Sequence, residues 1–166
     1  MTKKNRLLAI FDRMEHERQT LAQALSNYSE ETLTKKPAPD KWSVTEVIEH
    51  LVKAESGALQ YMQTKLQYGG HRKAAATAGL KQRLLSLAIS LPIKYKAPKV
   101  VELPEASTAS YADAMASWED TRKKTRAAYE SLDNALVGHE LFKHPAGGKM
   151  NLIHGATFMR GHMNRH

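Results

Sequence analysis

The spacing of apolar residues is the feature that most constrains the fold of this chain. Over most of the sequence they recur at intervals of three and four positions, which places them on one face of an α-helix. The alternation of apolar and polar residues that would indicate a half-buried strand is not seen over a comparable length. The sequence therefore predicts an all-α fold, with helices over about residues 5–26, 44–68, 73–91, 110–129 and 150–166.

The second of these helices has the clearest boundaries. It opens with "SVTE", in which Ser43 and Glu46 form a capping box, so that each side chain accepts a hydrogen bond from a free backbone N–H at the helix start. Its apolar face continues through Leu51 and Met62 to the glycine pair at 69–70, which is a helix stop signal. The sequence thus marks both ends of one long amphipathic helix.

Prolines and glycines mark the connections. Residues 29–43 contain two prolines, and residues 91–108 contain three, which are too many for a central strand although "KVVEL" allows a short strand-like piece. The last connector is "HELFKHPAGGK", over residues 139–149. We therefore predict a single domain over residues 1–166, an antiparallel four-helix bundle with one extra, irregular helix over 73–91 and long Pro-rich connections.

The composition excludes several classes of protein. The chain of 166 residues is long enough to bury a core without disulfides, and it has no cysteine for zinc–thiolate sites, iron–sulfur clusters or a thiol nucleophile. No apolar run approaches the roughly 20 residues that span a membrane, and the N-terminus lacks the apolar region of a signal peptide. We expect a cytoplasmic protein that has no membrane partner.

The formal net charge of +8 would suit an acidic partner such as a nucleic acid. However, the lysines and arginines are scattered along the sequence, without a basic stripe or interleaved aromatic residues. We interpret the charge as a solvated basic surface, and a nucleic acid is the less favoured partner.

Histidines provide the candidate chemistry. His162 and His166, in "FMRGHMNRH", project from the same side of the last predicted helix, roughly 6 Å apart at the backbone, which suits two ligands of one divalent ion. A catalytic site usually has three protein ligands and one open position. His50 is the third candidate, because it lies at the edge of the apolar face of its helix, and His154 is the reserve ligand. The alternative is that the final pair is simply solvated.

Two segments resemble the DinB/YfiT-like superfamily. "KWSVTEVIEHL" is similar to its first motif, a Trp-Ser helix start followed by His-Leu, and "HPAGGKMNLIHGATFMRGHMNRH" is similar to its closing motif, which ends in HxxxH. The resemblance covers the whole chain and implies a four-helix bundle. It also implies that His50, His162 and His166 bind a divalent metal, usually zinc or nickel.

The resemblance implies an activity as well. Family members with known activity transfer or isomerise substrates with the help of low-molecular-weight thiols. We therefore expect a bacterial thiol-dependent transferase, or a hydrolase that uses metal-activated water, acting on a small-molecule substrate; a homodimer is compatible with the family. The absence of cysteine agrees with a thiol supplied as a cosubstrate. The alternatives are a non-catalytic helical module that works by association and, less favoured, a nucleic-acid-binding bundle.

Neighbouring residues are assigned roles by their position in the sequence. Arg160 and Arg165 flank the ligands and are candidates for holding an anionic thiol or a substrate carboxylate, with solvated surface residues as the alternative. Glu55 is a better candidate than the outward-facing Glu49 for accepting a hydrogen bond from an imidazole N–H. Trp42 is expected to pack in the core at the helix start.

The last predicted helix has two unusual features. Gly155 lowers helix propensity by roughly 1 kcal/mol relative to alanine, but it lies near the inward edge, where it would let another helix approach closely. In family members this helix continues beyond the second histidine, whereas here the sequence ends at His166. We therefore expect either a trimmed chain or a third ligand that is less firmly held.

Overall fold

The computed structural model describes residues 1–75, 77, 79–80, 110–145 and 147–166. Its helices are α1 (Lys3–Leu25), α2 (Glu30–Thr34), α3 (Val44–Tyr68), α5 (Tyr111–Ser131), the 3-10 helix η2 (Leu136–Gly138) and α6 (Leu152–Arg165). A two-stranded antiparallel hairpin, β1 (Phe142–His144) and β2 (Gly148–Met150), lies between η2 and α6. The described part of the chain is mostly helical, so the all-α prediction is confirmed in broad terms, with the hairpin as an unpredicted exception.

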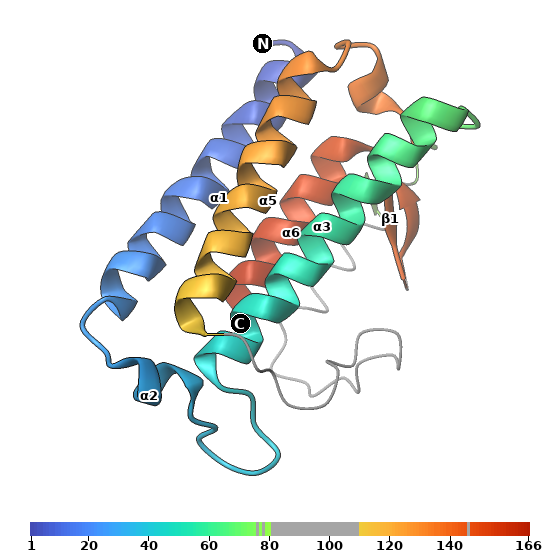
Figure 1. Cartoon of the computed structure of the whole chain (residues 1–166). Helices are drawn as coiled ribbons and strands as arrows, with labels where there is room; N and C mark the ends of the chain where they lie inside the picture. The colour runs from blue at the N-terminus through green and yellow to red at the C-terminus, as the bar shows by residue number, and fades with distance from the viewer. Residues whose placement is uncertain (76, 78, 81–109, 146) are drawn as a thin grey trace.

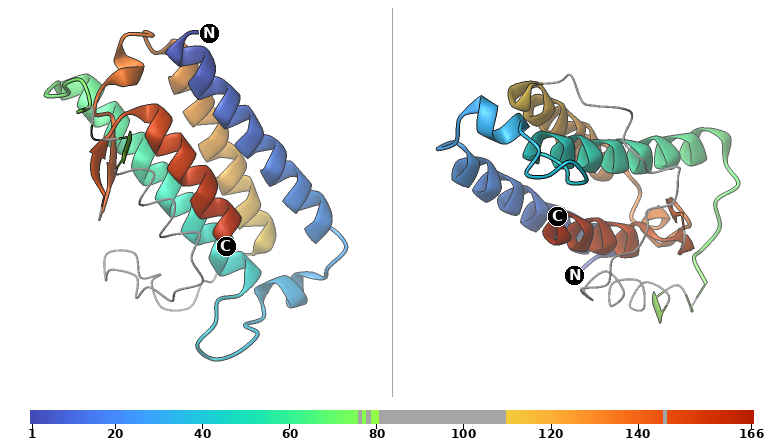
Figure 2. Two further views of the ribbon diagram at one scale, coloured as in Figure 1. Left: turned by 180° about the vertical axis from the view of Figure 1, so that it is seen from behind. Right: turned by 90° about the horizontal axis from the view of Figure 1, so that it is seen from below.

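The four long helices lie side by side (Figure 1). Helices α1 and α6 run in one direction, and α3 and α5 run in the other. Seen from below in Figure 2, α1 lies beside α6 and α3 beside α5, in agreement with the packing of these pairs. Each of the two pairs is therefore parallel, whereas helices of different pairs are antiparallel. The C-terminus lies at the same end as the start of α3.

Side-chain caps define the helix starts. The Ser43 hydroxyl accepts a hydrogen bond from the Glu46 N–H at 3.2 Å, and the Glu46 carboxylate accepts one from the Ser43 N–H at 2.8 Å, which confirms the predicted capping box. Ser110 and Asn151 cap α5 and α6 with their side-chain oxygens. The short helix α2, inside the predicted 29–43 connection, is capped in the same way by Ser29.

The helix predicted over residues 73–91 does not begin at Lys73. That residue pairs with His139 in an isolated antiparallel β-bridge, flanked by hydrogen bonds from Ala74 N–H to the Gly138 carbonyl and from Glu140 N–H to the Arg72 carbonyl. Residues 79–80 are helical. Residues 81–109 lie outside the described part of the chain, so the remainder of this helix and the Pro-rich connection stay predictions.

Two clusters of buried apolar side chains form the core. The larger one joins α1, α3, the hairpin and α6, and includes Leu7, Met62 and Met150. The smaller one joins α3, α5 and α6 around Trp118 and Leu51. The candidate histidines of α3 and α6 are thus attached to helices that the core holds at a fixed separation.

A buried ion pair also fixes α3 against α5. The Glu55 carboxylate accepts hydrogen bonds from Arg122 at 2.5 and 2.8 Å and from the indole N–H of Trp118 at 3.1 Å. Arg122 in turn contacts the sulfur of Met163 on α6 at 3.4 Å. Because buried charges are costly unless they are paired and hydrogen-bonded, removing either partner would leave an uncompensated charge.

The close approach at Gly155 involves the hairpin. A Cβ atom at this position would lie 2.4 Å from Cγ of Phe142, which is on β1. The prediction that another helix approaches here is therefore wrong, and the side chain of a short strand occupies the space instead. The hairpin therefore packs against the first turn of α6 through this contact.

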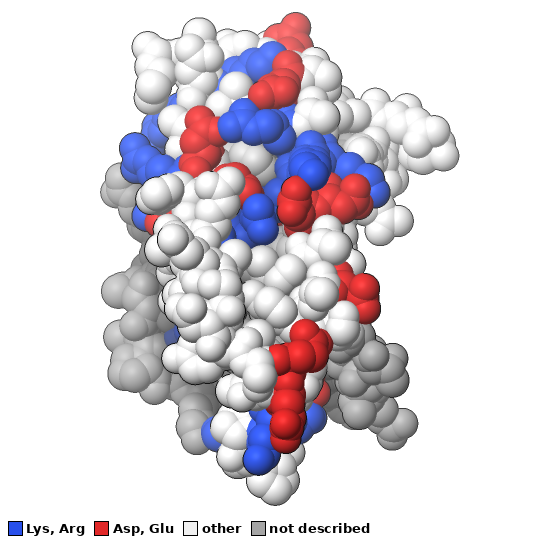
Figure 3. Space-filling model, turned by 60° about the vertical axis from the view of Figure 1, so that its left-hand side comes forward, with Lys and Arg blue, Asp and Glu red and all other residues white. Residues whose placement is uncertain are grey.

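Basic and acidic side chains are interleaved on the face that Figure 3 shows. Arg126 on α5, for example, forms ion pairs with Asp12 on α1 and with Glu130 one turn further along α5. The pattern agrees with the interpretation of the charge as a solvated surface. Within the described part of the chain, no helix is both long and apolar enough to span a membrane.

Candidate metal centre

Helix α3 carries His50 into the interior. The capping box fixes its first turn, and Thr45 donates a hydrogen bond to the carbonyl oxygen of Leu33, which ties that turn to α2. Further along α3, His50 is only 4% exposed. The ambiguous position at the edge of the apolar face therefore faces inward.

Helix α6 presents His162 and His166 one turn apart. Phe158 lies one turn before His162 and stacks on its ring, with the ring centroids 5.9 Å apart. The rings of His162 and His166 are 4.9 Å apart and nearly perpendicular. His162 is half-buried, whereas His166 is exposed at the end of the helix.

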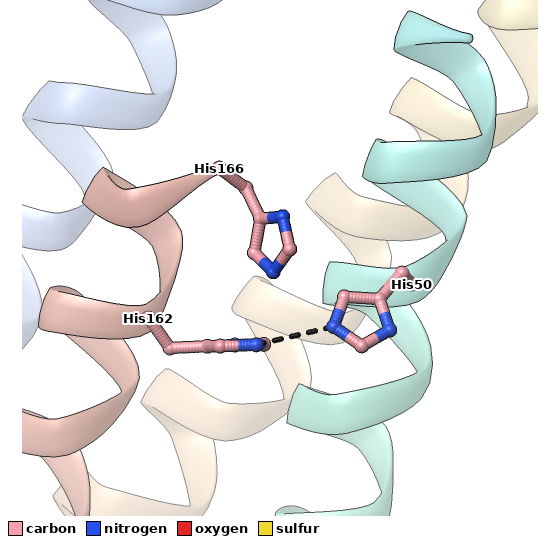
Figure 4. Close-up of side chains that lie close together, drawn as sticks. All are labelled: His50, His162 and His166. Atoms are coloured by element: carbon pink, nitrogen blue, oxygen red, sulfur yellow. Dashed lines mark hydrogen bonds between the residues drawn. The ribbon is translucent and has the colours of Figure 1, made fainter. Parts of the chain in front are cut away.

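The three histidines converge on one space (Figure 4). The Nε2 atoms of His50 and His162 are 3.1 Å apart, and one ring nitrogen of each of the three residues lies within 4.8 Å of the others. Within the described residues, they form the one group of at least three potential ligand side chains at such distances. Residues that are 112 positions apart in sequence, His50 and His162, thus meet directly.

The donor set fits a divalent transition metal. Two imidazole nitrogens bound to tetrahedral zinc, at about 2.0–2.1 Å each, are separated by roughly 3.3 Å, close to the distance between His50 and His162. Imidazole also suits nickel and copper. Three protein ligands leave one tetrahedral position open, which is the arrangement of catalytic zinc sites.

The Nδ1 atoms of His50 and His162 are buried and have no hydrogen bond among the described residues. In most metal sites this nitrogen donates to a carboxylate or a carbonyl oxygen. Glu55, the predicted partner, is instead bonded to Arg122 and Trp118, so that prediction is wrong.

Burial keeps these histidines neutral. It is the largest cause that lowers the pKa of His50 to about 4, with the charges of His166 and Lys53 contributing. Burial likewise lowers the pKa of His162 to about 3, assisted by His166 and His50, and it lowers the pKa of His166. Neutral imidazole is the form that binds a metal, so near pH 7 no imidazolium has to lose its charge before a metal binds.

A protein-family model described as the DinB superfamily matches residues 13–166. The chain belongs to the DinB superfamily. It is also similar to the uncharacterized protein YuaE of Bacillus subtilis (strain 168), with 25% identity over 142 residues that cover 86% of this chain and 83% of the relative. No solved structure matches it. The family inferred from the two sequence motifs is thus confirmed.

Trp42 lies beside the histidines of this DinB-superfamily protein. Its ring centroid is 5.0 Å from that of His50 and 6.0 Å from that of His166, on which it stacks. The side chain is half-buried, so the prediction of a core position is wrong. The signal that could have revealed this was present, because Trp42 immediately precedes the Ser43 cap and so starts the helix that carries His50.

The arginines that flank the ligands in sequence lie in other environments. Arg160 forms an ion pair with Glu17 on α1 at 2.5 Å, which leaves its guanidinium committed to that carboxylate. Arg165 is exposed. The reserve ligand His154 is absent from the group of three; its ring lies 3.5 Å from where a Cβ of Gly79 would stand.

A pocket of about 370 Å³ opens next to the candidate metal centre of the DinB domain. His50 and His162 form one wall, and apolar and aromatic side chains from α3, α6 and β1 form most of the others. Lys53 on α3 and Lys143 on β1 are its cationic residues. Sequence reasoning missed both lysines, because neither lies in a motif and the hairpin that positions Lys143 was not predicted.

Proposed function

We propose that this protein is a metal-dependent enzyme in which His50, His162 and His166 bind a divalent ion, zinc or nickel. The observation that supports it is the convergence of three neutral imidazoles beside a pocket of small-molecule size. When bound, such an ion can lower the pKa of a bound water to about 7 or hold a thiol as its thiolate.

Other residues of the chain would position the ligands and surround the substrate. The core holds α3 and α6 at the separation that the three ligands need, and Phe158 orients the ring of His162. The pocket walls cover part of the space where a substrate would lie. The protein has no cysteine, so a thiol-dependent transfer would use a low-molecular-weight thiol as cosubstrate. Hydrolysis by metal-activated water is the other reaction that the same site supports.

We further infer that residues 1–166 form one domain and that the four long helices constitute the four-helix bundle of the superfamily. The match over residues 13–166 supports both. The relative from Bacillus subtilis supports a bacterial setting. A cytoplasmic location and a homodimer stay predictions.

The metal content of protein purified without a histidine tag tests the proposal. We expect near-stoichiometric zinc or nickel in the wild-type protein and its loss in His50→Ala. His16→Ala, which changes an exposed histidine on α1, is the matched control and should keep the metal. A wild-type protein without metal, or a His50→Ala protein that retains it, would refute the assignment. Transfer assays with several low-molecular-weight thiols, followed by hydrolysis assays, then separate the two reactions.

A further inference from the structure

The pocket beside the histidines has a chemical character of its own. Its volume of about 370 Å³ falls at the lower end of the range of small-molecule sites. Because His50 and His162 belong both to its wall and to the triad, a molecule in the pocket would lie against the candidate metal position.

Aromatic side chains form the surface opposite α3. The rings of Phe142 and Phe158 are 6.1 Å apart, and the ring of His144 meets Phe158 edge-on with centroids 4.3 Å apart. Tyr61 and Met159 add further apolar surface. Walls of this kind favour the flat body of an aromatic ligand, through offset and edge-to-face contacts.

The charged side chains of the described pocket lining have one sign. Lys53 and Lys143 are the only charged side chains among the described residues that line the pocket, and none of these residues is Asp or Glu. Arg160, which the sequence suggested for binding an anion, is engaged by Glu17. The cationic residues of the pocket therefore come from α3 and β1, and they favour an anionic ligand over a cationic one.

Gly57 lies in the interior of α3 and lines the same pocket. Glycine is unfavourable at such a position relative to alanine. None of the described atoms lies within 4 Å of where its Cβ would stand, so packing against the described residues does not require a glycine there. The absence of a side chain instead leaves room in the pocket.

We propose that the substrate is a small organic anion with an aromatic body. The body lies between Gly57 and the two phenylalanines, and the carboxylate or equivalent anionic group is bound by Lys143 and Lys53. This inference rests on the proposed function in one respect, namely that the end of the molecule nearest His50 and His162 is the one that reacts.

Calorimetric titration of the metal-loaded, full-length protein tests the choice of ligand. The probes are 3-phenylpropionate, the neutral 3-phenylpropanamide and the cationic 3-phenylpropylamine. We expect the carboxylate to bind best and the amine at least roughly 10-fold more weakly, because the amine would meet two lysines. Equal binding of all three probes, or binding of none, would overturn the proposal.

Variants locate the binding. Lys143→Gln should weaken the binding of the carboxylate about 5-fold and leave the binding of the amide unchanged. Lys149→Gln is the matched control, because Lys149 is the cross-strand neighbour of Lys143 but is outside the described pocket lining. Gly57→Ala should weaken the binding of the carboxylate and of the amide equally, and Gly57→Leu should weaken both further. Neither substitution should lower the midpoint of thermal unfolding below that of the wild type. If Gly57→Leu binds as the wild type does, the ligand lies elsewhere.

The metal content of each variant keeps this inference distinct from the proposed function. If the protein holds metal but binds no probe, the proposed function stands and the substrate class is wrong. If the metal-free protein binds the carboxylate with the same dependence on Lys143 and Gly57, the pocket is anion-selective even where the metal assignment has failed. If binding requires the metal and ignores Lys143, the carboxylate is bound by the ion, and the role of the lysines is refuted.

Discussion

The two halves of α6 differ in what they contact. In the first half, Gly155 and its buried neighbours pack against the hairpin and the larger core cluster. In the second half, His162 contacts His50 directly, and His166 is exposed. One helix of 14 residues thus joins a tightly packed segment to a candidate ligand segment. The difference teaches that the packing of α6 and its candidate metal ligands lie on different turns of the helix, so substitutions should affect stability and the proposed metal binding separately.

The largest effect should come from His162→Ala. Removal of one of three ligands should lower metal affinity by more than roughly 100-fold, since the loss of mere outer hydrogen-bond partners of a ligand already costs 10–100-fold. The helical signal in circular dichroism should be retained, because the core does not depend on this ring. His154→Ala, in the first half of α6, is the control and should keep the metal. A large loss of helicity on His162→Ala or on chelation would contradict the separation of the two halves.

The reciprocal test is Gly155→Ala. The added methyl group would have to displace Phe142, so we expect the free energy of unfolding to fall by about 1–3 kcal/mol, as for other overpacked cores. Gly161→Ala in the same helix meets no described atom within 4 Å and should instead raise stability by up to about 1 kcal/mol. Urea unfolding of the metal-free proteins measures both changes in stability. Before the metal is removed, both variants should hold as much metal as the wild type. Equal stability of the two variants would show that the Phe142 side chain can move aside without a measurable energetic cost.

The smallest effect that we expect is a loss of stability in mild acid. The folded protein lowers the pKa of His50 to about 4 and that of His162 to about 3, whereas an unfolded histidine titrates near about 6.5. As the pH falls from about 6.5 toward 4, the unfolded chain binds protons before the folded protein does, so the free energy of unfolding of the metal-free protein decreases. Above about pH 6.5 both states are deprotonated at these histidines, and their titration no longer changes the free energy of unfolding. Solvent on the side of His166 screens the charges and limits the loss.

Urea unfolding of the metal-free protein across this pH window measures the effect. His162→Ala should show a shallower dependence on pH than the wild type. An identical slope in the two proteins would mean that His162 does not contribute to the acid sensitivity.

Local signals predicted much of this arrangement. The Ser43–Glu46 capping box fixed the start of α3 correctly, and with it the phase that turns His50 inward. The spacing of His162 and His166 predicted that the second half of α6 presents two neighbouring candidate ligands, because residues four apart on a helix are neighbours whatever the helix packs against. The first half was harder, since the fit of Gly155 depends on Phe142, a residue from a different element.

The missed features depend on contacts between distant residues or on very short elements. Strands of three residues, such as β1 and β2, are too short to show an alternating pattern. The partner of Glu55 is Arg122, 67 positions away, so no local pattern could direct the carboxylate there and away from the histidines. For α2 a signal did exist, because Ser29 followed by two glutamates is a typical helix start.

The fluorescence of Trp42 can report on the candidate metal centre. The chain has two tryptophans, and they occupy opposite environments: Trp42 is stacked on His166 near His50, whereas Trp118 is fully buried and hydrogen-bonded to Glu55. An open-shell ion such as Ni²⁺ quenches indole emission steeply with distance, and Zn²⁺ has no unpaired electrons with which to do so. Nickel bound by the three histidines should therefore quench the redder emission of the half-buried Trp42 more than the bluer emission of Trp118. The fluorescence of the unlabelled protein would then report both the occupancy of the site and the kind of metal bound.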